Sequence, residues 1–332
     1  MKQFVVFLYF LIHCEAVLND RPIIGVLSQE LTDMIADNYG DNYVSYIAAS
    51  YIKHLESAGA RVVPVWINQT SEYYEYIVNS VNGLVIPGGA APFNASDGYA
   101  TAGKELYNLA KQKNEEGVNF PVLGVCLGFE LLAVLSADEY DLRSICDIQN
   151  VALPLNFSSD YKSSRMYKDA SDEMVKIMQT ENVTINFHHW CITDNDLAEG
   201  NVSDQWHVLS YSEYNGTKFV SSFEHTEYPF YGYQFHPEKN TFEWKITNNN
   251  PHTANAVLVE QYYGSFIVNE ARKNNNSFPN FNQEMEALIY NYSTSYTTHN
   301  TPFEQIYFFP RTRSNLQVYN YHNYHSSNNY YN

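Results

Sequence analysis

Basic residues are scarce in this sequence. Lysine and arginine together number 19, against 37 aspartate and glutamate residues, and the formal net charge is −18 over 332 residues. A protein that binds DNA or RNA needs a basic surface to neutralise phosphates. We therefore expect no nucleic-acid partner.

Long apolar runs are missing after the N-terminus. Residues 4–12 are almost wholly apolar and follow Lys2, but this run is far shorter than the roughly 20 residues that span a bilayer. Cys14 and Ala16 place small residues at positions −3 and −1 of a cleavage site. The pattern predicts a signal peptide over residues 1–16, and we expect no membrane partner.

In a secreted protein, some asparagines of this chain are candidate N-glycosylation sites. N-x-S/T sequons accept N-linked glycans on the surface of secreted proteins. Some arise by chance in so asparagine-rich a chain, and we expect more than half to be exposed and glycosylated. With the signal peptide they predict the secretory route, to the lysosome or the extracellular space. The sequons stand at Asn68, Asn94, Asn156, Asn182, Asn201, Asn215, Asn275 and Asn291.

Cysteine is rare, with four residues in the whole chain. Removal of the signal peptide takes Cys14 and leaves Cys126, Cys146 and Cys191. An odd number of cysteines in a secreted protein implies at least one free thiol. If Cys146 and Cys191 pair, Cys126 is free. A disulfide at Cys126 would instead exclude it as a nucleophile, and the sequence leaves both pairings open.

The order of apolar segments predicts the fold. Apolar residues make up 45% of the chain, which is ample for a core. Short apolar runs alternate with amphipathic helical segments, as in a parallel sheet with helices on both faces. We predict an α/β fold, a three-layer α/β/α sandwich with a mostly parallel central sheet. The predicted strands are 23–27, 61–65, 83–86 and 122–125, and the predicted helices are 42–57, 72–80 and 99–113.

The pattern changes in the second half of the chain. Shorter predicted strands there form an antiparallel flap of the same domain, and a helix over residues 251–274 covers one face of the sheet. Residues 313–332 are mainly tyrosine, asparagine, histidine and serine with little apolar content, which predicts a disordered tail over residues 311–332. The shorter strands are 151–153, 184–187, 206–211 and 219–223, and the last strong strand is 231–235.

A G-x-C-x-G motif centred on Cys126 lies between an apolar strand and a predicted helix. It is the thiol version of the nucleophile elbow, a sharp turn in which side chains at Gly124 or Gly128 would collide with the backbone. The helix dipole would favour the Cys126 thiolate, and the Leu127 amide would point at a forming oxyanion. The alternative is a buried structural cysteine between packing glycines.

A second glycine-rich turn follows the strand 83–86. In parallel sheets the active site lies at the carboxyl ends of the strands. Gly88 and Gly89 would therefore expose their amides at the same sheet edge as Cys126, and would complete an oxyanion hole with the Leu127 amide. The simpler interpretation is a loop that needs glycine.

The strand 231–235 ends in the sequence His236-Pro237-Glu238. A thiol nucleophile requires an imidazole that removes its proton and a carboxylate that holds the imidazole tautomer. Pro237 fixes the backbone between the two. Taken alone, these residues favour a surface loop with unrelated polar residues. The combination with Cys126 in an α/β chain instead favours the catalytic interpretation.

Histidine and cysteine also cluster over residues 188–191, which read His-His-Trp-Cys. A structural zinc site needs four ligands at spacings that close a tetrahedron, and the sequence offers no second pair. We therefore expect no metal here. A substrate contact by His188 is the favoured interpretation.

These blocks resemble the gamma-glutamyl hydrolase (folylpolyglutamate hydrolase) family of class I glutamine amidotransferase-like proteins. The resemblance covers about residues 21–310, which we take as one domain. It implies a flavodoxin-like fold of the class I glutamine amidotransferase type. Besides the motifs at Cys126 and His236, it rests on residues 21–25, 48–51, 55–65, 126–130, 186–188, 231–239 and 268–274.

The resemblance implies an activity and a place for it. It implies a lysosomal or secreted cysteine peptidase that cuts γ-glutamyl bonds in folate and antifolate poly-γ-glutamates through a thioester. It implies no cofactor, a small-molecule substrate and a homodimer. By the same resemblance Cys126 is the nucleophile, His236 the general base and proton donor, Glu238 the residue that orients His236, and Gly89 and Leu127 the donors of oxyanion amides.

The resemblance also implies substrate-binding roles for His188, Gln234 and Glu130. Ammonia-channelling amidotransferases usually carry glutamine four residues after the cysteine, and Glu130 stands there instead, which favours another γ-glutamyl substrate. A polyanionic substrate needs local cations for its α-carboxylates. Candidates by charge alone are Arg143, Arg165 and Lys239.

Three other functions compete with this hypothesis. A glutamine amidotransferase-type glutaminase would need a synthetase partner or domain, which this chain does not encode. A non-catalytic secreted binding protein on the same fold would carry an unreactive or disulfide-bonded Cys126. A general cysteine peptidase of the related intracellular families would leave the motif at His236 unexplained.

Overall fold

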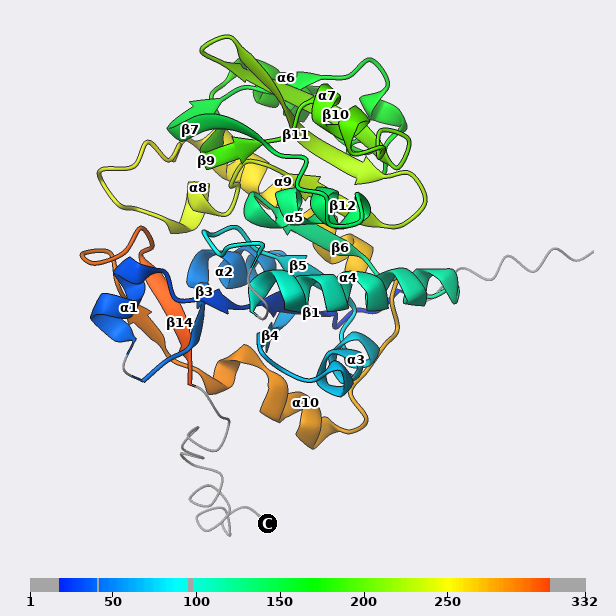
Figure 1. The fold of residues 1–332 in the computed structure, drawn as a ribbon, viewed down its shortest axis with the longest axis vertical. Helices are drawn as coiled ribbons and strands as arrows, with labels where there is room; N and C mark the ends of the chain where they lie inside the picture. Colours follow the sequence, from blue (N-terminus) through cyan, green and yellow to red (C-terminus); the bar gives the residue numbers. More distant parts are fainter. Residues whose placement is uncertain (1–17, 41, 95–97, 311–332) are drawn as a thin grey trace, which may run out of the picture.

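The computed structural model describes residues 18–40, 42–94 and 98–310 (Figure 1). The predicted signal peptide at 1–16 and the predicted tail at 311–332 lie outside these residues. Within them, no helix is both long and apolar enough to cross a membrane.

An eight-stranded sheet forms the centre of the molecule. The first five strands in spatial order pair in parallel, and the last three add antiparallel pairs at one edge. The prediction of a mostly parallel central sheet with an antiparallel flap is confirmed. In spatial order the strands are β4 (Arg61–Val65), β1 (Ile23–Leu27), β5 (Gly83–Ile86), β6 (Val122–Val125), β12 (Phe230–Tyr233), β11 (Thr217–His225), β10 (Trp206–Tyr214) and β8 (Asn156–Phe157).

Helices cover both faces of this sheet, as Figure 1 shows for α4 in front of the strands and α9 behind them. Alternate side chains of one strand point to opposite faces. Thus Ile24 and Val26 of β1 pack into the core of one face, and Ile23 and Leu27 into the core of the other. The first core includes α2 (Ala49–Ser57), α6 (Asp172–Thr180) and α9 (Ala254–Ala271); the second includes α3 (Ser71–Ser80), α4 (Tyr99–Glu115) and α5 (Leu127–Ser136).

Two small antiparallel sheets flank the main one. The four-stranded sheet has the order β13 (Thr294–Tyr296), β14 (Gln305–Phe309), β3 (Ser45–Ala48) and β2 (Gln29–Glu30). The two-stranded sheet joins β7 (Ser144–Leu153) to β9 (Thr184–Cys191). The remaining α-helices are α1 (Asp33–Tyr39), α7 (Asp194–Glu199), α8 (Lys239–Phe242) and α10 (Phe281–Ala287).

The predicted helix over residues 42–57 is wrong in its first half. Residues Ser45–Ala48 form β3, and only Ala49–Ser57 form a helix. Ile47 of β3 pairs with Tyr307 of β14, a strand from the far end of the described chain. A partner so distant in sequence leaves no trace in local periodicity, so tertiary pairing overrode the helical pattern. The end of the helix is as expected, with Gly59 at a φ of +92°.

The predicted helix over residues 251–274 is confirmed with shorter bounds. Helix α9 starts after Thr253, whose side chain accepts a hydrogen bond from the Ala256 amide. Its stripe of Val259, Tyr263 and Ile267 is buried against the sheet. The helix therefore closes the face of the sheet on which the candidate site lies.

Candidate active site

Cys126 lies in a strained turn between β6 and α5. Its φ of +51° and ψ of −107° are unusual for a residue with a side chain. The surrounding backbone holds this conformation, because the Cys126 amide donates to the Tyr233 carbonyl at 2.9 Å. A Cβ at Gly128 would overlap the Ile86 carbonyl, and one at Gly124 would overlap the Gly128 carbonyl. Both glycines are thus required by close backbone approach, as the motif predicts.

Gly128→Ala is therefore expected to destabilise the protein. The added methyl group meets fixed backbone of β5 rather than a side chain that can move, so we expect a loss of about 3 kcal/mol in the free energy of unfolding. Guanidinium unfolding would measure it. Gly216→Ala is the control, because a Cβ there meets open space and only its φ of +82° is unfavourable, at about 1 kcal/mol. A loss at Gly128 no larger than at Gly216 would contradict this account.

His236 and Glu238 form a buried pair just beyond the end of β12. Nδ1 of His236 lies 2.7 Å from Oε1 of Glu238, and both side chains are almost fully buried. Burial lowers the pKa of His236, so the imidazole is neutral and its Nδ1–H donates to the carboxylate. Burial acts against ionisation of Glu238, but its interaction with His236, to which it is hydrogen-bonded, and the charge of Lys239 outweigh burial and lower its pKa. The pair is a carboxylate-oriented imidazole, which leaves Nε2 free to accept a proton.

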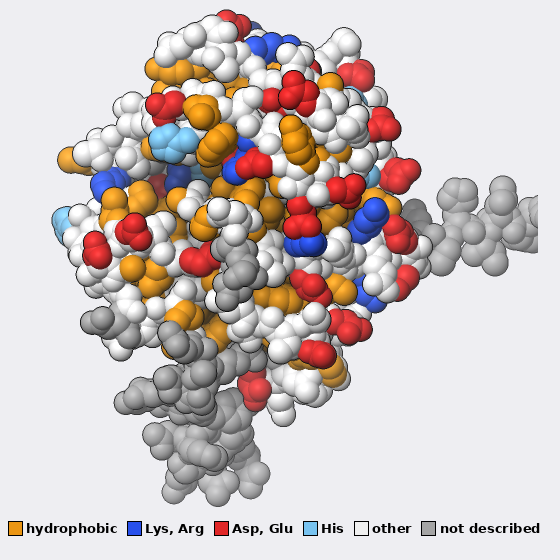
Figure 2. Space-filling model, viewed as in Figure 1, with side chains coloured by type: hydrophobic (Ala, Val, Ile, Leu, Met, Phe, Trp, Pro, Cys, Tyr) orange, Lys and Arg blue, Asp and Glu red, His pale blue; other side chains and the backbone are white. Residues whose placement is uncertain are grey.

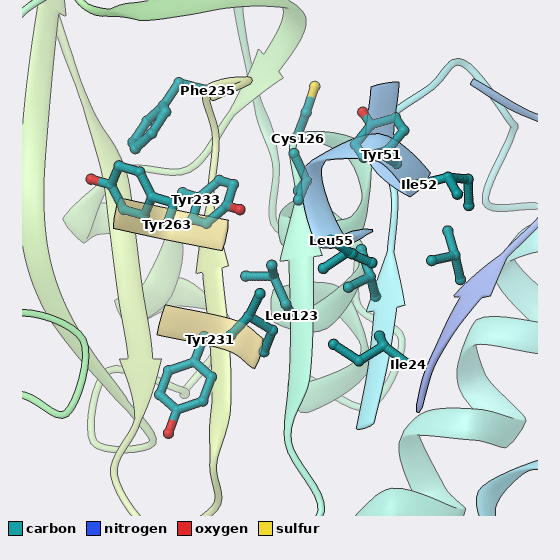
Figure 3. Packing of buried hydrophobic residues seen from close by; sticks show 14 of the residues in the cluster. Ile24, Tyr51, Ile52, Leu55, Leu123, Cys126, Tyr231, Tyr233, Phe235 and Tyr263 are labelled. Carbon is teal, nitrogen blue, oxygen red and sulfur yellow. The ribbon is translucent and has the colours of Figure 1, made fainter. Parts of the chain in front are cut away.

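Gly88 stands where the thiol and the imidazole approach each other. A Cβ at Gly88 would lie 3.0 Å from Cβ of Cys126 and 2.8 Å from Cε1 of His236. Figure 3 shows the Cys126 side chain at the carboxyl end of β6, beside the Tyr51 hydroxyl. The structure therefore brings Cys126, His236 and Glu238 together at the sheet edge where the sequence places them.

The Cys126 thiol is protonated near neutral pH. Burial raises its pKa well above the ordinary value, and the Glu130 and Glu238 carboxylates raise it further. The hydrogen bond from the Leu127 amide and the charge of Lys239 lower it by less. The helix N-terminus thus favours the thiolate, as expected, but burial and the two carboxylates outweigh it. The site therefore holds a neutral thiol beside a neutral imidazole.

This protonation state predicts how Cys126 reacts with iodoacetamide. Only the thiolate attacks the reagent, so the alkylation rate should rise steadily from pH 6 to pH 9 without a plateau. The native protein is alkylated at each pH, and the reaction is quenched at set times. Mass spectrometry of the peptide that contains Cys126 then gives the rate. A plateau near neutral pH would show a preformed thiolate–imidazolium pair and contradict the assignment.

Tyr51 is a residue of this site that the sequence did not identify. Its hydroxyl accepts a hydrogen bond from the Gly88 amide at 2.9 Å and lies 3.3 Å from Nδ1 of His236. Its position on one face of helix α2 is typical of a core residue, so no local signal singles it out. Because Tyr51 takes the Gly88 amide, the amides of Gly89 and Leu127 remain as the candidate oxyanion donors.

Gln29 holds the same turn from the other side. Its Nε2 donates to the Gly88 carbonyl at 2.8 Å, and its amide fills the space that a Cβ at Gly89 would need. The turn at 87–89 is therefore fixed by a tyrosine and a glutamine from two different elements. A glycine at position 89 is required by this close approach.

Glu130 and Gln234, the two predicted substrate-binding residues near Cys126, are hydrogen-bonded to each other. Nε2 of Gln234 donates to Oε1 of Glu130 at 3.0 Å, and Nη1 of Arg143 donates to Oε2 at 3.0 Å. Burial raises the pKa of Glu130 to about 7 in spite of these two donors. Arg143 also bonds Asp141 through two nitrogens, so its charge is already paired.

His188 and Arg165, both candidates for substrate contact, already have protein partners in the structure. The ring nitrogens of His188 lie 2.8 Å from the Trp190 carbonyl and 3.2 Å from the Asn186 side-chain oxygen, so both have protein partners. Burial lowers the pKa of His188 to about 3. Arg165 pairs with Glu224, which neighbours the start of β12 at the opposite end of the sheet from Cys126. Arg165 therefore lies outside the candidate site.

The cysteine pairing is now defined. Cys146 and Cys191 form a disulfide between β7 and β9, with their Cα atoms 6.0 Å apart. Cys126 is free and buried. The alternative in which Cys126 is oxidised is excluded, and Cys191 is not available as a zinc ligand. Across the described part of the chain, no group of three or more His, Cys, Asp or Glu residues is placed to hold a metal ion.

The sequence is similar to those of known proteins over nearly its whole length. The family model described as Peptidase C26 matches residues 22–238. Gamma-glutamyl hydrolase of Homo sapiens is 42% identical over 290 residues, covering 87% of this chain and 90% of that protein. Gamma-glutamyl hydrolase B of Dictyostelium discoideum is 33% identical and covers 94% and 90%, and gamma-glutamyl hydrolase 1 of Arabidopsis thaliana is 33% identical and covers 90% and 85%.

Solved structures match the fold more distantly. A glutamine amidotransferase from Methylobacillus flagellatus superposes with a TM-score of 0.44 at 9% identity, over 78% of this chain and 97% of that one. The fold class accordingly rests on the strand order given above, and the family on the sequence matches. This chain belongs to the peptidase C26 family of cysteine-type hydrolases, together with the gamma-glutamyl hydrolases of animals, Dictyostelium and plants.

Proposed function

We propose that this protein hydrolyses γ-glutamyl bonds in folate and antifolate poly-γ-glutamates, with Cys126 as the nucleophile. The observation that carries the proposal is the free Cys126 in its elbow beside the buried His236–Glu238 pair. The names of the relatives specify the γ-glutamyl bond. The folate part of the substrate comes from the resemblance of the sequence blocks to folylpolyglutamate hydrolases.

The first half of the proposed reaction forms a thioester. Nε2 of His236 takes the thiol proton as Cys126 attacks the γ-carbonyl carbon, and Glu238 stabilises the imidazolium that results. The oxyanion accepts hydrogen bonds from the Gly89 and Leu127 amides. Collapse of the tetrahedral intermediate breaks the C–N bond, and His236 gives its proton to the leaving amine.

The second half releases the acyl group. A water molecule enters on the side vacated by the amine, and His236 accepts one of its protons. The hydroxide attacks the thioester carbonyl, the same two amides hold the oxyanion, and the C–S bond breaks. The Cys126 sulfur regains a proton from His236, so the site returns to its starting neutral thiol and neutral imidazole.

The direct experiment is hydrolysis of a folate pentaglutamate at mildly acidic pH, with products resolved by chromatography. We expect release of glutamate or shorter γ-glutamyl peptides, and the pattern will show whether cleavage is internal or terminal. Release of ammonia from free glutamine with the pentaglutamate left intact would favour the glutaminase alternative. No turnover of either compound, with Cys126 inert to iodoacetamide, would favour a non-catalytic binding protein.

We also propose that the protein follows the secretory route and carries N-linked glycans. In support, all eight sequon asparagines named above are exposed in the structure. Asn291 is the least accessible to a glycan at its side-chain nitrogen, because Nδ2 donates to backbone carbonyls of Met285 and Leu288. Treatment of the secreted protein with an N-glycosidase should lower its mass.

We further propose that the protein is a homodimer, as its resemblance to the family implies. Sedimentation of the purified protein would test this.

A further inference from the structure

The surface of this enzyme offers little attraction to a polyanion. Acidic side chains are spread over the face shown in Figure 2, in keeping with the net charge of −18. A γ-linked glutamate brings a carboxylate with every residue, so the site must supply a cation locally. Two candidates, Arg143 and Arg165, already bond protein carboxylates. Lys239 is the third.

Lys239 is buried next to the proposed catalytic residues, and its ammonium has no hydrogen-bond acceptor among the described residues. Lys239 is the first residue of helix α8 and is only 5% exposed. Within the described residues, its ammonium makes no hydrogen bond or ion pair. It lies over the faces of the Phe187 and Phe303 rings, 5.4 and 4.9 Å from their centroids. Ring faces favour a cation but leave its three N–H donors unused.

The Lys239 charge acts to lower the pKa of Glu238 and of Glu243, but neither carboxylate accepts a hydrogen bond from the ammonium. Glu238 is bonded to His236, and Oε2 of Glu243 accepts the Glu304 amide at 2.7 Å. A buried ammonium whose donors are unsatisfied is costly, because it has lost water without gaining a hydrogen bond. Such a group is expected where a ligand supplies the missing acceptor. The acceptor that the proposed substrate carries in quantity is a carboxylate.

The position of Lys239 indicates which carboxylate it meets. Its amide donates to the His236 carbonyl at 3.3 Å. The Phe187 ring, over which the ammonium lies, packs edge-on against the His236 imidazole with centroids 6.2 Å apart. Lys239 is thus on the imidazole side of Cys126, and in the proposed reaction the imidazole protonates the leaving amine.

We propose that the Lys239 ammonium binds a carboxylate of the leaving glutamate and makes Lys239 a specificity-determining residue. This inference rests on the proposed function, since it identifies the recognition of the leaving group in that reaction. It assigns a chemical requirement to the substrate: the residue released by cleavage must carry an anionic group close to its amine.

The test compares two substrates in two enzymes. The substrates are a pteroyl-γ-glutamyl-glutamate and an analogue whose leaving group is propylamine, which lacks both carboxylates. Lys239→Met keeps an unbranched side chain that is one atom shorter and removes the charge. We expect it to lower kcat/KM for the glutamate substrate about 10- to 100-fold more than for the propylamine analogue. Lys239→Arg should recover part of the selectivity, and Lys104→Met, at an exposed ion pair, should leave the ratio unchanged.

Equal losses on both substrates would overturn the inference, because Lys239 would then act on the thiol or the imidazole. A selective loss that disappears with a substrate lacking the acyl-side α-carboxylate would also overturn it, since the cation would bind the other residue. An unchanged kcat/KM of Lys239→Met on the glutamate substrate would overturn the inference as well.

Binding by a catalytically inactive protein separates this inference from the proposed function. In a Cys126→Ala background, Lys239→Met should weaken binding of the glutamate compound, measured by calorimetry, about 10- to 100-fold more than binding of the propylamine compound. Absence of this difference overturns the inference. If the difference is present but the wild type shows no turnover, the proposed function fails and the carboxylate site stands.

Discussion

Cys126→Ala is expected to lower kcat for γ-glutamyl hydrolysis at least about ten-thousand-fold, to near the background rate. The variant keeps the amides of Gly89 and Leu127 and the His236–Glu238 pair, but it has no atom that can form the acyl-enzyme bond. Initial rates on a folate polyglutamate, followed by chromatography, measure the loss. Substrate affinity should change little, since the sulfur does not carry the binding energy.

The loss must come from chemistry and not from unfolding. Sγ of Cys126 donates to the Phe187 carbonyl at 3.7 Å and accepts from the Leu127 amide, so its removal should cost about 1 kcal/mol of stability. The control is Cys146→Ala with Cys191→Ala, which removes the disulfide and keeps the Cys126 thiol. That double variant should remain active at a temperature where it is folded. Residual activity above one part in a hundred in Cys126→Ala would exclude Cys126 as the nucleophile.

Glu238→Gln is expected to lower kcat about a thousand- to ten-thousand-fold with little change in KM. The carboxylate accepts the Nδ1–H of His236 at 2.7 Å and so leaves Nε2 unprotonated. A glutamine amide can donate to Nδ1, which places the proton on Nε2 and presents the thiol with a donor. It also removes the charge that stabilises the imidazolium.

Glu243→Gln provides a matched control for Glu238→Gln. Glu243 is a buried carboxylate five residues later in the chain that accepts a backbone amide and has no bond to His236. Its substitution should change kcat less than about tenfold. Steady-state rates of both variants against pH complete the test. A loss below tenfold in Glu238→Gln, or equal losses in the two variants, would contradict the orienting role of Glu238.

Local patterns were enough to predict the sheet and the placement of the thiol and the imidazole. Strands of the parallel sheet are continuous apolar runs, and the predicted bounds of β5 and β6 are those of the structure. Their carboxyl ends must meet at one edge, so Cys126 after β6 and His236 after β12 are brought together by topology alone. Glycine spacing at the elbow is likewise a local requirement of backbone approach.

Features that depend on distant contacts were not predictable in this way. Strand β3 exists because β14 and β2 pair with it, and its own residues fit a helical period. Tyr51 reaches Gly88 and His236 from a helix face where a tyrosine is typical of the core. The protonated state of Cys126 follows from burial and from Glu130 and Glu238, which a sequence does not place in space.

The most direct test of the account is to trap the acyl-enzyme. Wild-type protein mixed with a folate polyglutamate is quenched in acid during turnover, digested, and analysed by mass spectrometry. We predict a peptide containing Cys126 whose mass is increased by the γ-glutamyl acyl group of the substrate, and the same peptide unmodified in Glu238→Gln at equal times. Product release without acylated Cys126, or an acyl group on another residue, would contradict the central claim that this family member acts through a Cys126 thioester.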